Sequence, residues 1–307
     1  MSLISHKKFI RYFLIIAACI LGCVVTLNIL IDPYDLVGVR LLPALVRSDR
    51  LVKTEMLANA EAAPDILIMG SSRTLKLSPE TIHRLTGQTA LNLGTGSCRA
   101  EGPLLMILYA ESIDRLPRTI IVGVDIEAYH DKLPADLRWN RVPGIQGRIS
   151  ELDESAYKLF FNDLAEVLSL DMAKDSIRSI KRHRDTSPPP LRTTFRDNGV
   201  IDYPLWQSWK DAGTFDLDAQ VDHSILEYRG RYHGFEEISP WRKERFEEFL
   251  VFCQKHDIEV IAFITTLHPR VQADLREQVP FDELKGDLMI FLETMQAEYG
   301  MAFYDLS

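Results

Sequence analysis

The chain has 307 residues, of which 26% are charged and 46% are hydrophobic, a balance that excludes disordered, collagen-like and low-complexity proteins. Acidic residues outnumber basic ones by 44 to 35, so the formal net charge is −9 and nucleic-acid binding is not expected. The four cysteines include no C-x-x-C pair, which excludes a disulfide scaffold and a zinc ribbon. The composition leaves one sizeable globular domain and a separate N-terminal feature.

That feature is a run without formal charge over residues 12–31. As a helix, this run is about 30 Å long, which is the thickness of the hydrocarbon core of a bilayer. Three basic residues lie within the first eleven positions, and basic flanks stay in the cytoplasm. We therefore expect residues 1–35 to form a cytoplasmic tip and a single-pass anchor in the cytoplasmic (inner) membrane. Residues 36–307 would then form a domain on the outer, periplasmic side.

Two other interpretations of the N-terminus compete with the anchor. Cys19 and Cys23 each end a sequence similar to a lipoprotein cleavage site, but the residues after Cys23 stay apolar, where a lipidated end normally becomes polar. A cleaved signal peptide has a shorter apolar core and a small-residue cleavage site, and residues 28–34 offer no convincing one. The uncleaved anchor is the favoured interpretation.

The rest of the chain alternates short apolar runs with amphipathic segments. Strands are expected at residues 66–69, 89–93, 119–126, 258–266 and 301–304. Two of the helices between them have clear start signals, at Ser78-Pro79 and Ser239-Pro240. This alternation predicts a three-layer α/β/α domain around a parallel, flavodoxin-like five-stranded sheet.

Residues 127–236 break the alternation, so we expect a large insertion after the third strand. Basic residues are frequent from Lys174 to Arg196, which is typical of a solvated helix face and less often of contact with an anionic polymer or lipid head groups. The aromatic residues that follow favour packing of the insertion over stacking on sugar rings.

The C-terminal ends of the predicted strands carry a set of reactive residue types. Ligand sites of open parallel sheets lie beyond these ends. At or just beyond the ends of the first four strands lie Ser72, then Gly94 and Gly96, then Asp125, and finally His268. Each is a weak signal alone, but a serine, a glycine-rich turn, an acid and a histidine on one rim together indicate nucleophilic chemistry.

Two segments resemble a known family. The sequence ILIMGSSRT at residues 66–74 resembles the first block of the SGNH (GDSL-like) hydrolases, and LNLGTG at 91–96 is similar to the second block. The Asp32-Pro33-Tyr34 segment after the anchor also resembles membrane-anchored SGNH-like proteins of bacteria. The resemblance covers residues 65–126 well and 237–307 loosely.

The resemblance assigns roles to individual residues. It implies that Ser72, rather than Ser71, is the nucleophile. It places the N–H groups of Ser72 and Gly96 in the oxyanion hole, with Gly94 as the next choice after Gly96. The expected oxyanion and substrate-binding set consists of five residues: Gly94, Gly96, Asn92, Arg73 and Asp125. Arg73 is expected to hold a substrate carboxylate or to fix Asp125.

The chain departs from the family pattern at two places. The third block of the family has an asparagine that donates a hydrogen bond to the oxyanion; this chain has Asp125 there, and an ionised carboxylate cannot donate. We expect Asp125 to accept from Arg73 or Ser71, or to bind a substrate hydroxyl. The final Asp-x-x-His block is not found before Ser307, which implies a sequence truncated at its C-terminus. If the base lies within this chain, His268 is the best placed candidate.

The resemblance therefore implies an extracytoplasmic, membrane-anchored esterase or O-acyltransferase that acts through Ser72 on acyl groups of an envelope glycan or another ester substrate. The alternative is a catalytically inactive SGNH-like module that binds glycan or assembles an envelope complex. No cofactor is expected, and because no histidine pair has metal-ligand spacing, no metal is expected either. The sequence does not indicate an oligomeric state.

Overall fold

The computed structural model describes residues 3–39, 41–145, 148 and 156–307. The chain forms two compact units, Met1–Ser48 with Glu154–Pro189, and Asp49–Asp153 with Pro190–Ser307. The first unit thus includes the expected anchor and, from the expected insertion, the segment that packs with the N-terminal helix.

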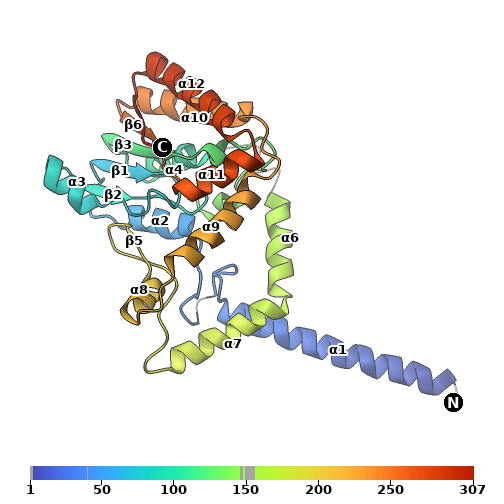
Figure 1. Ribbon diagram of the computed structural model, residues 1–307. Helices are drawn as coiled ribbons and strands as arrows, with labels where there is room; N and C mark the ends of the chain where they lie inside the picture. Colours follow the sequence, from blue (N-terminus) through green and yellow to red (C-terminus); the bar gives the residue numbers. More distant parts are fainter. Residues whose placement is uncertain (1–2, 40, 146–147, 149–155) are drawn as a thin grey trace. The chain divides into compact units, whose positions relative to one another are not determined.

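The first unit is built from helices. Helix α1 (Leu3–Ile31) includes a segment, His6–Ile31, that is long and apolar enough to cross a membrane. Helices α6 (Ala156–Val167) and α7 (Leu170–Arg184) pack against α1 (Figure 1). The buried Asn28 of α1 donates two hydrogen bonds from its Nδ2 atom, to the carbonyl oxygens of Val167 (2.9 Å) and Ser169 (3.1 Å). This side chain fixes the α6–α7 junction on α1.

The second unit contains the predicted parallel sheet. Its strands are β1 (Ile66–Met69), β2 (Ala90–Asn92), β3 (Thr119–Val124), β6 (Glu259–Ile264) and β7 (Ala302–Asp305). They follow the flavodoxin-like order β2-β1-β3-β6-β7, and every pair is parallel. The α/β fold predicted from the sequence is therefore confirmed. The continuous apolar run of β1 is buried at all its positions, as expected for a strand covered on both faces.

Helices complete the three layers of this unit. They are α2 (Asp49–Ala58), α3 (Pro79–Thr86), α4 (Gly102–Ser112), α8 (Pro204–Asp211), α9 (Leu217–Tyr232), α10 (Pro240–Lys255), α11 (Pro269–Gln278) and α12 (Phe281–Tyr299). Two short 3₁₀ helices, η1 (Ile126–Tyr129) and η2 (Leu137–Arg141), follow β3. The start signal at Ser78 is confirmed, because its side chain accepts a hydrogen bond from the Thr81 N–H group.

The expected insertion does not form a single body. Its helices α6 and α7 belong to the first unit, whereas α8, α9 and a small antiparallel pair, β4 (Thr194–Phe195) and β5 (Ile201–Asp202), belong to the second. The pair is joined to the edge of the main sheet, because the N–H group of Asn92 on β2 donates to the carbonyl oxygen of Asn198 at 2.9 Å.

Candidate functional site

The chain turns sharply at Gly70, directly after β1. Its φ angle is +126°, and a Cβ atom there would lie 2.6 Å from the carbonyl oxygen of Gly123, so the turn requires glycine. Ser71 is buried by this turn, and its Oγ atom accepts a hydrogen bond from the Arg73 N–H group at 3.2 Å. Ser72 is half-buried, and its side chain makes no hydrogen bond to any described residue.

Arg73 lies against two buried carboxylates. Its guanidinium is 3.1 Å from the carboxylate of Asp125 and forms a second ion pair with Glu127. Asp125 also accepts a hydrogen bond from the Thr265 hydroxyl at 2.6 Å, and Glu127 accepts one from the Tyr232 hydroxyl at 3.1 Å. The expected contact between Arg73 and Asp125 is present, and these five residues are named the Arg73 cluster.

The two carboxylates of this cluster have opposite pKa shifts. Burial raises the pKa of Asp125, and the Arg73 guanidinium offsets this effect only in part. Burial also opposes ionisation of Glu127, but the ion pair and hydrogen bond with Arg73 outweigh it and lower the pKa of Glu127. Burial therefore favours the protonated form of Asp125 within this pair. A protonated Asp125 gains the hydrogen-bond donor that an ionised one lacks.

The amide groups after β2 are engaged by acceptors within the protein. The N–H group of Gly94 donates to Oδ1 of Asn92 at 3.0 Å, and the N–H group of Thr95 donates to the carbonyl oxygen of Gly70 at 2.9 Å. The N–H group of Gly96 donates to the carboxylate of Asp49. The Gly96 amide that was expected in the oxyanion hole, and the Gly94 amide that was the next choice, thus already have a protein acceptor.

Asn92 has a structural part in the same loop. It is fully buried, and its Nδ2 atom donates to the carbonyl oxygens of Thr74 (2.8 Å) and Leu77 (2.9 Å). Its Oδ1 atom is the acceptor for Gly94. The side chain therefore joins the loop after β1 to the loop after β2, and all its polar atoms are used in doing so.

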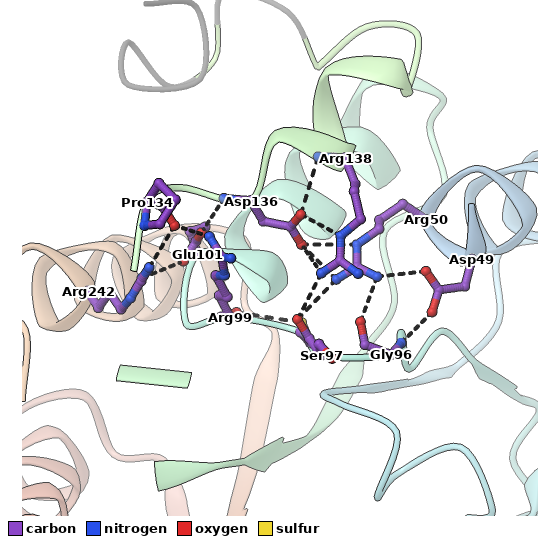
Figure 2. Close-up of polar contacts among 11 residues, drawn as sticks. Asp49, Arg50, Gly96, Ser97, Arg99, Glu101, Pro134, Asp136, Arg138 and Arg242 are labelled. Carbon is purple, nitrogen blue, oxygen red and sulfur yellow. Dashed lines mark hydrogen bonds and ion pairs between the residues drawn. The ribbon is translucent and has the colours of Figure 1, made fainter. Parts of the chain in front are cut away.

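Asp49 belongs to a buried polar network centred on Arg50 of α2 (Figure 2). The Arg50 guanidinium lies 2.6 Å from the carboxylates of both Asp49 and Asp136. It also donates to the carbonyl oxygens of Gly96 (2.7 Å) and Ser97 (3.2 Å). Arg50 thereby connects α2 with the loop after β2 and with the segment before η2.

Further charged residues complete the Arg50 network. Arg138 contacts the carboxylate of Asp136 at 2.7 Å. Burial opposes ionisation of Asp136, but the positive charges of Arg50 and Arg138 outweigh it and lower the pKa of Asp136 to about 2. Glu101 accepts a hydrogen bond from the backbone N–H of Asp136 at 2.9 Å, and it lies 3.5 Å from the guanidinium of Arg242 (Figure 2). The network spans α2, the two ends of the β2–α4 loop, η2 and α10.

The Arg50 network was not predicted from the sequence, although α2 carries a signal for it. The buried residues of α2 are Arg50, Lys53, Thr54 and Leu57, at the helical spacing i, i+3, i+4 and i+7. Cationic residues on the core face of a helix require buried partners. Lys53 finds them in the carbonyl oxygens of Asn92 (2.8 Å) and Gly199.

His268, the expected base, has a structural contact in its own helix. It is exposed at the start of α11, where its side chain accepts a hydrogen bond from the Arg270 N–H group at 3.2 Å and caps the helix. No hydrogen bond joins His268 to Ser72 in the described part of the chain. Of the expected site residues, the structure brings Arg73 and Asp125 together, and it pairs Asn92 with Gly94.

A pocket of about 330 Å³ opens beyond the ends of β2 and β3. Its charged lining residues carry both signs: Arg99, Asp125, Glu127, Glu227 and Arg231. Ser97, Cys98, Ala128, Leu133 and Gly230 complete the lining. Asp125 and Glu127 are shared with the Arg73 cluster, whereas Ser72 does not line the pocket.

No family model, no curated protein and no solved structure matches this chain. The likeness to SGNH hydrolases therefore depends on the sequence resemblance alone. The pocket, the Arg73 cluster and the amide groups after β2 are the features of the chain that bear on its function.

Proposed function

We propose that this chain is a membrane-anchored, SGNH-like module of the cell envelope that binds a polyhydroxylated ligand, an envelope glycan, without acyl-transfer chemistry. The anchor is α1, whose apolar segment follows three basic residues, so that its N-terminus is cytoplasmic and the α/β unit lies outside the inner membrane.

The pocket beyond β2 and β3 carries this proposal. Its size suits one or two sugar rings, and its carboxylates and guanidiniums supply the acceptors and donors that hydroxyl groups need. Asp125 and Glu127 are held in place by Arg73, Thr265 and Tyr232, so their free lone pairs have fixed directions. Fixed polar groups at the end of a parallel sheet favour binding of an oriented polar ligand.

Binding is favoured over catalysis by the contacts of the expected machinery. An oxyanion hole needs N–H groups that are free to meet the developing charge, and those of Gly94 and Gly96 are already bonded. The serine needs a base within hydrogen-bond reach, and His268 caps α11 instead.

A second candidate function is an esterase or O-acyltransferase that uses Ser72. One observation favours it: Ser72 is half-buried at the end of β1, and its side chain makes no hydrogen bond to any described residue. Both serines of the turn are available for a clean comparison. A fluorophosphonate probe that labels the wild type and Ser71→Ala, but not Ser72→Ala, would establish the enzyme and overturn the binding module.

The binding proposal is tested with full-length protein in detergent and two forms of one bacterial envelope polysaccharide, O-acetylated and saponified. We expect calorimetry to show saturable binding that is weakened about tenfold or more by Glu227→Ala combined with Arg231→Ala, which remove about two polar contacts from the pocket. The matched control is Arg229→Ala on the same helix, because Arg229 pairs with Asp274 and does not line the pocket. If the double variant and Arg229→Ala bound the polysaccharide with equal affinity, the assignment of this pocket as the binding site would be contradicted.

A further inference from the structure

Helix α6 has two unlike faces. Its large apolar residues, with Leu168 directly after the helix, recur at the spacing i, i+3, i+4, i+7 and i+11, and they are 41% to 64% exposed: Tyr157, Phe160, Phe161, Leu164 and Leu168. The opposite side carries Lys158, Asn162 and Glu166. A continuous apolar stripe of this size marks a contact surface rather than scattered exposure.

The position of α6 on α1 shows which surface that stripe meets. Asn28 lies three residues before the end of α1, and it holds the carbonyl oxygen of Val167 at the end of α6 and the Ser176 hydroxyl of α7 (3.1 Å). The hydroxyl of Tyr34, just beyond α1, donates to Asp175 at 2.5 Å. These contacts place the C-terminal end of α6 at the level where α1 leaves its apolar segment.

The direction of α6 relative to α1 agrees with a position at the surface of the bilayer. In Figure 1, α6 runs across the direction of α1, so a bilayer crossed by α1 has α6 along its surface. The apolar side chains of α1, such as Phe13 and Ile16, are themselves exposed and continue toward the same level. Helices that lie in a membrane interface have this composition, with aromatic residues on the apolar side and charges on the other.

We propose that α6 is an interfacial helix that lies in the bilayer surface at the C-terminal end of α1, with its Tyr157–Leu168 stripe among the acyl chains. This inference depends on the proposed membrane insertion of α1. It assigns a second membrane contact to the chain, one that fixes the orientation of the first unit on the bilayer where a single helix would leave it free to rotate.

The test uses the full chain with Cys19 and Cys23 replaced by serine, in vesicles of phosphatidylethanolamine and phosphatidylglycerol. Cys98 and Cys253 are buried, and burial raises the pKa of each thiol to about 12, so neither competes for a thiol reagent. An environment-sensitive nitrobenzoxadiazole dye is attached to a new cysteine at one position at a time: Phe161→Cys on the apolar stripe, Glu166→Cys on the polar face, or Leu14→Cys in α1. Phe161, Glu166 and Leu14 are all exposed, so the labels do not disturb a core.

Quenching by lipids that carry a doxyl group near the head group reports on each position. We expect blue-shifted emission at position 161 and quenching that is about threefold stronger than at position 166, because only the apolar face enters the acyl region. Water-like emission at position 161 with a lipid-embedded position 14 would overturn this inference and leave the anchor intact. Blue-shifted emission without lipid quenching would also overturn it, since a protein surface would then cover the stripe. A water-exposed position 14 would instead refute the anchor itself.

Discussion

The carboxylate of Asp49 accepts a hydrogen bond from the N–H group of Gly96, the amide that the SGNH resemblance places in an oxyanion hole. The same carboxylate is 2.6 Å from the guanidinium of Arg50, whose other contacts bind the loop after β2 to α2. An acceptor with a full negative charge therefore occupies the position where a catalyst would need an empty one. This relationship connects the Arg50 network with the engaged state of the Gly96 amide.

Removal of this acceptor should destabilise the second unit. Asp49→Ala leaves the Gly96 N–H group without its acceptor and removes one of the two hydrogen bonds of the Arg50 Nη1 group, so we expect the free energy of unfolding to fall by about 1–3 kcal/mol. Urea unfolding followed by tryptophan fluorescence measures it, because all four tryptophans belong to this unit. Asp49→Asn keeps an acceptor oxygen and should lose less; an unchanged Asp49→Ala protein would show that the contact contributes nothing.

Substitution of Asp136 should lower the free energy of unfolding more than substitution of Asp49. Its side chain is 2% exposed and that of its partner Arg50 is fully buried, so Asp136→Asn leaves a buried guanidinium without its main counter-charge. We expect a loss of about 3–5 kcal/mol in the same urea experiment. The control is Asp282→Asn, whose ion pair with Arg276 is largely exposed and should change stability by about 0.5 kcal/mol or less. Similar losses in the two variants would contradict the central place given to Arg50.

The lowered pKa of Asp136 also predicts how the stability of the second unit changes as the pH falls. The pKa of this carboxylate is lowered to about 2, against about 3.9 in an unfolded chain, so the folded state releases its proton more readily. Its contribution is fully present above about pH 4 and is lost as the pH falls through about 2. The stability difference between wild type and Asp136→Asn should therefore shrink between pH 4 and 2, as measured by unfolding at fixed urea. A constant difference would refute the lowered pKa.

The sequence predicted the sheet well because each strand depends on a local property. The run at residues 66–69 is apolar without interruption, and a strand of that kind is stable only when both faces are covered. The start signal at Ser78 is equally local, since a cap needs only neighbouring residues.

The site was less predictable because its contacts join distant segments. Asp49 and Gly96 are 47 residues apart, and Arg50 and Asp136 are 86 apart. Hydrogen bonds between distant residues produce no periodic pattern in a single sequence. The rule that ligand sites lie beyond the strand ends therefore located the edge of the sheet, but it did not show which backbone amides already have a protein acceptor. The Arg73–Asp125 pair was predictable for the opposite reason: both residues lie within four positions of the C-terminal ends of adjacent parallel strands.

Substitution of Gly70 tests the geometry of the turn that contains Ser71 and Ser72. An alanine there would need a φ of +126° and would place its Cβ atom 2.6 Å from the carbonyl oxygen of Gly123. Gly87 is a matched control, because its φ is +75° and its Cβ position is open. We expect Gly87→Ala to cost about 1–2 kcal/mol from backbone strain alone, and Gly70→Ala to cost clearly more. Equal costs, measured by urea unfolding, would show that the turn relaxes freely.

Lys53 makes the stability of the second unit depend on alkaline pH. Its Nζ atom is buried against the carbonyl oxygens of Asn92 and Gly199, and burial lowers its pKa from 10.5 to about 7, although Asp49 acts in the opposite direction. Between these two values the unfolded chain binds a proton that the folded chain does not, so the free energy of unfolding rises with pH by up to about 1.4 kcal/mol per unit. Lys53→Met removes this titration.

The expected result is a difference between wild type and Lys53→Met that grows in favour of wild type from pH 7 to 10. Urea unfolding of both proteins at each pH measures it, and Lys76→Met, at a half-exposed lysine of the same unit, should keep the profile of the wild type. Parallel profiles for wild type and Lys53→Met would mean that Lys53 stays protonated in the folded protein. Its bonds to Asn92 and Gly199 would then be those of an ammonium group, and the edge of the sheet at β2 would carry a buried positive charge.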